Sequence, residues 1–261
     1  MRKATITLFL AASVAAGGLF AQKPFVMTAA NKKQTYDKIT DNNGILTAKA
    51  GPIVRKLKPS QYKYAWIPLN QAPELAKMVR AYNAKKYAEV ASLFKQAYPK
   101  YHRLGWQCPI ILVTAKALNN LGKKSAAIAK LELVKKMPLN SSEFKDYFKA
   151  KRLLAELYVQ TGKFDKAKSA LKDLGRSSDD SIVAFANNIR GDVYLKEGKT
   201  KDAVIEYAKT ALLFGKNNRK ERPQALSKIV ELLRKEKNNK STNFEKMLRS
   251  DYPDSPETKN L

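Results

Sequence analysis

Two stretches of the chain, 36 residues apart, carry nearly the same pattern of small, aromatic and turn residues. The first lies within residues 149–167 and the second within residues 190–203. The matching pairs are Ala155 and Gly191, Tyr158 and Tyr194, Gly162 and Gly198, and Ala167 and Ala203. A repeat period of roughly 20–50 residues indicates supersecondary units that stack, because one unit cannot bury its apolar face alone. This repeat constrains the fold more than any other feature.

From Pro73 onward, apolar residues recur at the spacing of one helix face. Leu75, Met78, Val79 and Tyr82 show the i, i+3, i+4, i+7 pattern of an amphipathic helix. Turns are predicted at four positions that lie 37, 40 and 36 residues apart, namely Lys85, Gly122, Gly162 and Gly198. These turns divide residues 72–250 into about five helical hairpins. Small residues at positions 115, 155 and 191 are expected to let the helices of a hairpin approach closely.

Prolines predict two boundaries in this helical region. Pro99 predicts the end of the second helix, followed by a loop over residues 100–107. Near the C-terminus, the turn residues from Tyr252 to Pro256 predict the end of the last hairpin, so we expect residues 251–261 to form a tail.

The repeated pattern resembles the tetratricopeptide repeat, abbreviated TPR. It consists of a small residue, two spacers, an aromatic residue, a glycine turn, and then an alanine followed by an aromatic residue, as in Ala203 to Tyr207. The resemblance covers roughly residues 72–250. It implies a mainly α fold, a TPR-like α-α superhelix that is a right-handed solenoid of helical hairpins.

Residues 22–71 carry strand and turn signals instead of helical periodicity. Asp41-Asn42-Asn43-Gly44 lies between two β-favouring runs and predicts a hairpin with a four-residue loop. Turns at Gly51-Pro52 and Pro59-Ser60 then give three or four short strands, a small β-meander that we expect to pack on the first helices. Aromatic residues are interleaved with basic ones in this segment, namely Tyr62, Tyr64 and Trp66 with Lys63, Arg55, Lys56 and Lys58. A half-buried amphipathic sheet is the favoured interpretation, and a nucleic-acid-binding surface is the alternative.

Residues 1–21 have the composition of a targeting segment. They begin with Arg2 and Lys3, continue with an apolar run from Ile6 to Phe20 and end at the small residue Ala21. This pattern predicts a secretory signal peptide cleaved near Ala21, and therefore a periplasmic or secreted protein. An uncleaved membrane helix is the alternative for the same residues.

Residue counts exclude several kinds of site. Cys108 and His102 are the only cysteine and histidine, so neither an internal disulfide nor a cysteine-based zinc site can form. The sequence contains no glycine-flanked nucleophile, phosphate-binding loop or dinucleotide motif. We predict that the protein is not an enzyme, with no catalytic residues, metal, cofactor or small-molecule substrate. A His102–Cys108 nucleophile pair and a Glu156–Asp192 carboxylate pair are the weaker alternatives.

In TPR proteins, the first helix of each hairpin lines a concave groove that holds a peptide. By this resemblance, the candidate groove residues are Lys116, Asn119, Asn120, Arg152, Glu156, Gln160, Asn188, Asp192 and Lys196. Their asparagines can hydrogen-bond a peptide backbone. Glu156 and Asp192 depart from the Lys/Asn pattern that clamps a C-terminal carboxylate in some TPR domains, so we do not predict that clamp. The resemblance implies a non-enzymatic scaffold or adaptor for protein–protein interactions. Together with the predicted signal peptide, it predicts an exported protein of the bacterial cell envelope, with another envelope protein or peptide segment as its partner.

The chain is strongly basic, with 50 Lys and Arg residues against 23 Asp and Glu residues and a net charge of +27. Such a charge implies long-range attraction to anionic surfaces. The densest basic runs are residues 216–222 and 234–240. They leave open an alternative function, a binder of anionic polymer or nucleic acid, and weak contact with anionic polymers or lipid headgroups. A third hypothesis is an enzyme accessory whose β-rich segment carries the activity.

Overall fold

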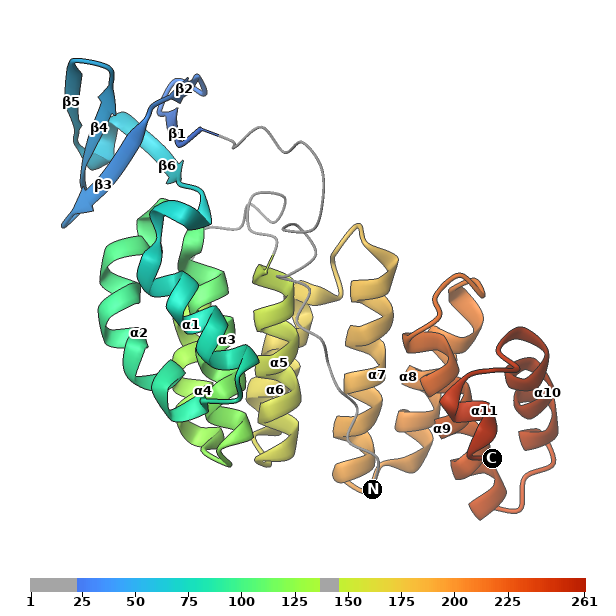
Figure 1. Ribbon diagram of the computed structural model, residues 1–261. Coiled ribbons are helices and arrows are strands. Elements are labelled where there is room, and N and C mark those ends of the chain that lie inside the picture. Colours follow the sequence, from blue (N-terminus) through green and yellow to red (C-terminus); the bar gives the residue numbers. More distant parts are fainter. Residues whose placement is uncertain (1–22, 137–145) are drawn as a thin grey trace. The chain divides into compact units, whose positions relative to one another are not determined.

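The computed structural model describes residues 23–136 and 146–261 (Figure 1). The predicted signal peptide lies outside the described residues. The chain divides into two compact units, Met1–Asp146 and Tyr147–Leu261. Among the described residues, no helix combines the length and the apolar character needed to cross a membrane.

The first unit begins with six short strands in two antiparallel sheets. One sheet has the order β2-β1-β6, formed by Lys33–Thr35, Phe25–Thr28 and Tyr62–Trp66. The other is a meander with the order β3-β4-β5, formed by Lys38–Asn42, Ile45–Ala50 and Ile53–Leu57. The predicted meander is therefore present, and the structure adds a second sheet to the three or four strands expected.

The predicted hairpin at Asn43-Gly44 is tighter than expected. Asn42 pairs with Ile45, so the loop has two residues rather than four. Asn43 and Gly44 both have positive φ, at 50° and 91°, which is the requirement of the two-residue turn that matches strand twist. The Asp41 side chain accepts a hydrogen bond from the Gly44 amide at 2.7 Å, which stabilises the turn.

The aromatic residues of β6 pack against their own sheet. The Trp66 ring stacks on Phe25 with centroids 5.8 Å apart, and Tyr64 contacts the same ring edge-on. The Tyr62 hydroxyl donates to the Gly44 carbonyl oxygen at 2.7 Å. These contacts favour the half-buried amphipathic sheet over a nucleic-acid surface, because base stacking needs exposed ring faces.

The described part of the first unit also contains four α-helices: α1 (Pro73–Asn83), α2 (Tyr87–Tyr101), α3 (Gln107–Asn120) and α4 (Lys124–Leu131). They form two hairpins, and α3 packs against both α1 and α2. The strands contact the connection between α2 and α3, as expected. The Trp106 indole donates to the Ile67 carbonyl oxygen at 2.9 Å, and Arg103 pairs with Asp41 at 3.1 Å.

The predicted end of α2 at Pro99 is wrong. The helix continues through Pro99 to Tyr101 and is followed by a π-helical turn at His102–Trp106. Inside this turn, Leu104 and Gly105 have non-helical dihedrals, and Gly105 has φ of 82°. The helix persists because Tyr101 is buried and its hydroxyl donates to Glu74. These tertiary contacts outweigh the one backbone hydrogen bond that a proline removes near a helix end.

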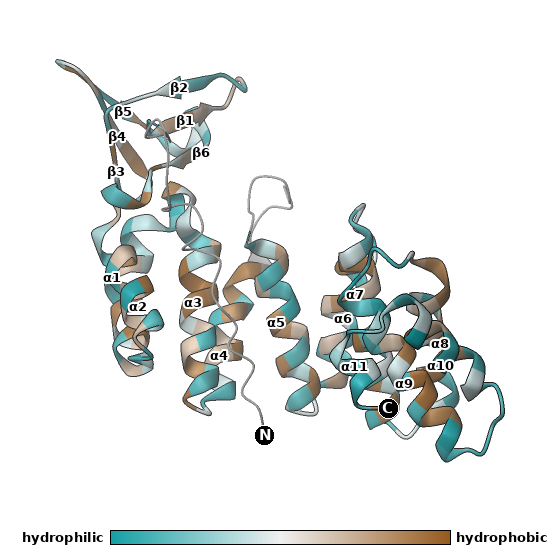
Figure 2. Ribbon diagram, turned by 45° about the vertical axis from the view of Figure 1, so that its right-hand side comes forward, coloured by the Kyte–Doolittle hydropathy of each residue, from teal (hydrophilic) through white to brown (hydrophobic). Residues whose placement is uncertain are grey.

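The second unit contains three hairpins and a short final helix (Figure 1). Its helices are α5 (Tyr147–Gln160), α6 (Phe164–Leu174), α7 (Asp180–Lys196), α8 (Thr200–Leu213), α9 (Glu221–Lys235), α10 (Ser241–Asp251) and α11 (Pro256–Lys259). Hydrophilic and hydrophobic residues occupy different sides of most of these helices (Figure 2). At the start of α7, the Asp179 side chain accepts from the Ser181 amide at 2.8 Å and caps the helix.

Neighbouring hairpins of this unit share buried cores. Leu171 and Leu174 of α6 pack with Phe185 of α7 in one hydrophobic cluster. Tyr207 of α8 and Leu226 of α9 belong to a second cluster, which reaches α10. Full burial of each such side chain contributes about 1.5–3 kcal/mol. The predicted stacking of hairpins is therefore confirmed within this unit.

The C-terminal residues are more ordered than the predicted tail. Thr258 of α11 is buried, and its hydroxyl donates to the Tyr252 carbonyl oxygen at 2.6 Å. The Ser255 side chain accepts from the Thr258 amide at 3.1 Å and caps α11. Leu261 packs against the second hydrophobic cluster. Pro256 thus begins a helix, in the position where proline is tolerated.

Candidate functional site

Helices α5, α7 and α9 are the first helices of three successive hairpins, and α7 contacts both α5 and α9. Five polar residues on these helices interact with one another, and we call them the polar cluster: Arg152, Glu156, Asn188, Asp192 and Glu221. Four of the five are candidate groove residues from the sequence. The structure brings these four together within the second unit.

Glu221 is the centre of the polar cluster and is only 2% exposed. Arg152 lies 2.7 Å from its carboxylate, and Lys220 lies 3.8 Å from the same oxygen. The Arg152 guanidinium also lies 3.9 Å from the centre of the Phe185 ring. A carboxylate this deeply buried needs such partners, because an unpaired buried charge is very costly.

Glu156 and Asp192 are only partly buried, and burial raises the pKa of both carboxyl groups. Arg152 and Lys220 oppose the rise for Glu156, whereas Glu221 and Asp192 reinforce it. The Tyr207 hydroxyl donates to Asp192 at 2.7 Å, and burial together with this carboxylate raises the pKa of Tyr207. Glu156 is therefore electrostatically coupled to Asp192, and neither acid is a fully exposed surface residue.

A hollow of about 260 Å³ adjoins the polar cluster. Asn188 and Asp192 of α7 line it together with Tyr207 of α8, while the remaining lining residues are Gln224, Ser227, Lys228, Glu231 and Glu257. Among the described residues, no group of three or more His, Cys, Asp and Glu side chains has an arrangement that could hold a metal ion. The carboxylates that line the hollow can accept hydrogen bonds from a ligand with donors.

The sequence missed the residues that α9 contributes to this hollow. A signal for them exists, because the repeat continues for one more step. Positions 36 residues after Asn188 and Asp192 are Gln224 and Lys228, and both of these residues line the hollow. Glu221 has no such signal, since its role depends on burial at the start of α9.

The other candidate groove residues are placed differently. Gln160 and Lys196 are exposed at the C-terminal ends of α5 and α7. Lys116, Asn119 and Asn120 lie on α3 in the first unit. The Asn120 amide donates to the Lys116 carbonyl oxygen at 2.9 Å and also interacts with Tyr82 of α1, so its side chain serves the local structure.

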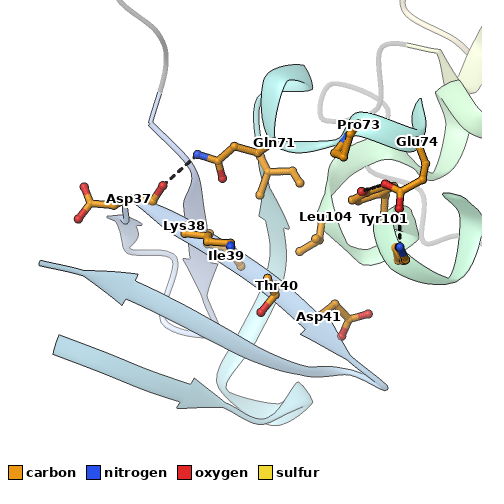
Figure 3. A pocket seen from close by; sticks show the side chains of 12 residues that line it. Asp37, Lys38, Ile39, Thr40, Asp41, Gln71, Pro73, Glu74, Tyr101 and Leu104 are labelled. Atoms are coloured by element: carbon orange, nitrogen blue, oxygen red, sulfur yellow. Dashed lines mark hydrogen bonds and ion pairs between the residues drawn. The ribbon is translucent and has the colours of Figure 1, made fainter. Parts of the chain in front are cut away.

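The first unit has a larger cavity of about 710 Å³ between β3 and the helices α1 and α2 (Figure 3). Its acidic side chains already have partners. Asp41 is paired with Arg103, and Glu74 binds both Lys100 and Tyr101. The Gln71 amide donates to the Asp37 carbonyl oxygen at 2.9 Å across the cavity wall. The contacts of Arg103 and Gln71 connect the region of β3 to the segments that flank the helices, and the contacts of Glu74 join α1 to α2. All of these are structural roles.

The weaker catalytic hypothesis for Cys108 finds no support in its surroundings. Cys108 is buried, and burial raises the pKa of its thiol to about 12, so the reactive thiolate is disfavoured at neutral pH. His102 stacks on Tyr98, and its Nδ1 lies 2.8 Å from the Tyr98 carbonyl oxygen. Both residues therefore have the structural surroundings that the sequence favoured.

One residue of the basic run at 216–222 is not part of an accessible basic surface. Arg222 is buried at the start of α9, where it pairs with Asp251 at 2.6 Å and donates to the Ala211 carbonyl oxygen at 2.8 Å. Its charge holds α8, α9 and the end of α10 together. Sequence alone could not distinguish it from the exposed Lys216 and Arg219.

Residues 68–233 match the family described as the tetratricopeptide repeat-like domain. The MamA protein has 15% sequence identity and a TM-score of 0.50, with 69% of this chain and 90% of that chain covered. PilW, a type IV pilus biogenesis factor, has 15% identity and a TM-score of 0.52, with coverage of 74% and 84%. The apo form of RapI has 11% identity and a TM-score of 0.59, and the match covers 71% of this chain and 54% of RapI. The sequence matches no curated protein sequence.

Proposed function

Because this chain belongs to the tetratricopeptide repeat-like domain family, we propose that it is a non-enzymatic scaffold or adaptor that binds a segment of another protein. Folds of this family typically serve protein–protein interaction. The observation that carries the proposal is the polar cluster, which places buried and partly buried hydrogen-bonding groups of α5, α7 and α9 side by side on the first helices of three hairpins. Partner recognition through successive first helices matches the groove position that the sequence predicted.

The proposed setting is the bacterial cell envelope. This part of the proposal rests on residues 1–21, with their basic start, apolar run and small residue at Ala21. Sequencing the N-terminus of the mature protein tests it. We expect the chain to begin at Gln22 after export, and an intact Met1 in the mature protein would overturn the assignment.

Affinity capture from native extract tests the binding face. A triple alanine variant at Gln160, Lys196 and Gln224 changes exposed residues of α5, α7 and α9, and should lose the captured partner without unfolding. The matched control replaces Ser169, Lys201 and Asn243, which are exposed on α6, α8 and α10, and should keep it. Equal capture by both variants would show that this face does not bind the partner.

The alternative function, binding of an anionic polymer, rests on the net charge of +27 alone. The same capture experiment distinguishes it. Polyanion binding falls steeply with salt because counterions are released. If the unmodified protein loses its captured partner when the salt rises from about 50 to 200 mM, the result would favour polyanion binding instead.

A further inference from the structure

The hollow beside the polar cluster contains a buried acceptor without a donor. Asn188 is 6% exposed, and its amide nitrogen donates to the Glu221 carbonyl oxygen at 2.8 Å and approaches the Glu221 carboxylate at 3.5 Å. The opposite orientation of the amide would place its oxygen against these two acceptors, so the orientation is fixed. The Asn188 Oδ1 atom then has no hydrogen-bond partner among the described residues. A buried acceptor of this kind is costly until a donor reaches it.

The charged residues around the same hollow are mainly acidic. Asp192, Glu231 and Glu257 line it against one base, Lys228. Lys228 already lies 3.1 Å from Glu231. Asp192 receives a hydrogen bond from neutral Tyr207, and no ion pair is recorded for Asp192 or Glu257 among the described residues. In a chain with a net charge of +27, this hollow therefore has the opposite sign.

The size of the hollow limits what it can hold. Sites for whole small molecules usually enclose about 300–1,000 Å³. A volume of about 260 Å³ is smaller than that range and fits one side chain of a longer ligand. The hollow is thus suited to a single group that is rich in donors and positively charged.

We propose that this hollow binds a basic side chain, arginine or lysine, of the partner's bound segment. The inference rests on the proposed function and specifies the partner, a protein segment that carries a cation at this position. Arginine fits best, because its five N–H donors can satisfy several carboxylate and amide oxygens at once. A ligand of this kind is opposite in charge to the C-terminal carboxylate that some TPR domains clamp.

Nuclear magnetic resonance of the complete chain tests the proposal with N-acetyl-arginine amide as the probe. Two matched probes are N-acetyl-citrulline amide, which has nearly the same shape without the charge, and N-acetyl-glutamate amide. The arginine probe should shift the side-chain amide signals of Asn188 and Gln224 in a saturable manner. The citrulline probe should bind about tenfold more weakly, the equivalent of roughly 1.4 kcal/mol. Equal binding of both probes, or shifts confined to other residues, would overturn the proposal.

Variants that are expected to change arginine binding in opposite directions separate an effect of charge from an effect of misfolding. Asp192→Asn and Glu257→Gln each remove one negative charge and should weaken arginine binding, whereas Lys228→Gln removes the only base and should strengthen it. Glu236→Gln removes an exposed acid that does not line the hollow and should leave binding unchanged. A uniform loss in the three hollow variants would indicate a structural effect and contradict the proposal.

The two proposals can fail separately. Failure of the arginine probe, together with partner loss in the Gln160/Lys196/Gln224 variant, would overturn the basic side chain and leave the scaffold function intact. Binding of the probe, with partner capture unaffected in that variant, would show that this face does not bind the partner and would overturn the assignment of the cation to a partner protein.

Discussion

Five residues with positive φ end the first helix of the five hairpins in the described part of the chain. They are Lys85, Gly122, Gly162, Gly198 and Lys237, with φ between 56° and 76°. In each hairpin the next amide donates to a carbonyl oxygen five residues earlier, as in Lys163 to Tyr158 at 2.8 Å and Asn238 to Leu233 at 2.9 Å. This hydrogen bond closes the helix end and requires the left-handed backbone. All four turns predicted from the sequence are present, and Lys237 is a fifth.

Lysine occupies a glycine position in two of these turns, which leads to a stability prediction. A residue with a Cβ atom pays about 1–2 kcal/mol in the left-handed region, and part of this is recovered when glycine replaces it. Lys85→Gly and Lys237→Gly should therefore each raise the free energy of unfolding by about 0.5–1 kcal/mol. Urea denaturation measures the change.

The neighbouring residue supplies the control. Lys86 has φ of −80°, so Lys86→Gly should lower the stability. Gly162 has open space around its Cα atom, so Gly162→Ala should also lower stability through backbone strain alone. A gain in Gly162→Ala, or no gain in Lys85→Gly, would contradict the role of the backbone angle.

Asp192 gives a prediction for pH. Its pKa is raised chiefly by burial and further by Glu221 of α9, against the lowering effects of Tyr207 of α8, Lys228 of α9 and Lys196 of α7. A carboxyl group with a raised pKa in the folded state favours folding while it is protonated. Its contribution is complete below the unfolded pKa of about 4 and is lost as the pH rises through the folded value.

Asp192→Asn removes this titration and keeps an oxygen that accepts from Tyr207. The melting temperature of the variant relative to the original protein should therefore rise between pH 4 and pH 7. Thermal melts across this range measure the difference, and Asp202→Asn on the exposed side of α8 serves as the control. A difference that stays flat with pH would show that the raised pKa does not affect folding.

At the scale of helices, the close approach of α7 and α8 depends on one glycine. A Cβ atom at Gly191 would lie 2.6 Å from the Tyr207 ring, which is shorter than a real contact. Gly191→Ala should force the ring or helix α8 to move and should destabilise the protein by about 1–3 kcal/mol. Denaturation experiments measure this loss.

Gly215→Ala is the matched control, since no atom lies near the Cβ position there. A second variant, Gly191→Ala with Tyr207→Leu, should recover part of the loss because the smaller side chain leaves room. Without such recovery, the cost at Gly191 would not come from the contact with Tyr207.

The elements that the sequence predicted well are those that follow from periodicity. Leu75 and Met78 mark the buried face of α1, and Gly162 and Gly198 mark turns, because helical spacing and backbone angle are local properties. The end of α2 beyond Pro99 and the order of α11 depend on distant partners such as Glu74 and Tyr252. Strand β1 was missed for a related reason, since only Val26 in it is fully buried.

The candidate site shows the same division between local and tertiary information. The repeat step of 36 residues relates Arg152 and Glu156 of α5 to Asn188 and Asp192 of α7, and equivalent positions of stacked hairpins adjoin. It could not show that Asn188 is buried against Glu221 or that Tyr207 binds Asp192, because these contacts depend on packing between helices. Nor could the net charge of +27 indicate an acidic hollow, which depends on the direction of individual side chains.

The charge of the whole molecule leads to the last prediction. Lys and Arg outnumber Asp and Glu by 50 to 23, so most basic side chains repel one another even where ion pairs such as Arg234–Glu245 form. Salt weakens both the repulsion between like charges and the attraction within ion pairs, but an exposed ion pair contributes only about 0–1 kcal/mol to stability. The excess of like charges acts over long distances, because the screening length is about 30 Å at 0.01 M salt and about 10 Å at 0.1 M.

Repulsion should therefore outweigh the loss of ion pairs, and the melting temperature should rise when sodium chloride increases from about 0.01 to 0.1 M. Removal of residues 1–21 takes away only Arg2 and Lys3 and should not change this result. An uncharged osmolyte at equal osmolality provides the comparison, because it leaves the charges unscreened. A melting temperature that falls with salt would mean that ion pairs contribute more to stability than repulsion removes, and that the basic residues are arranged as a paired network.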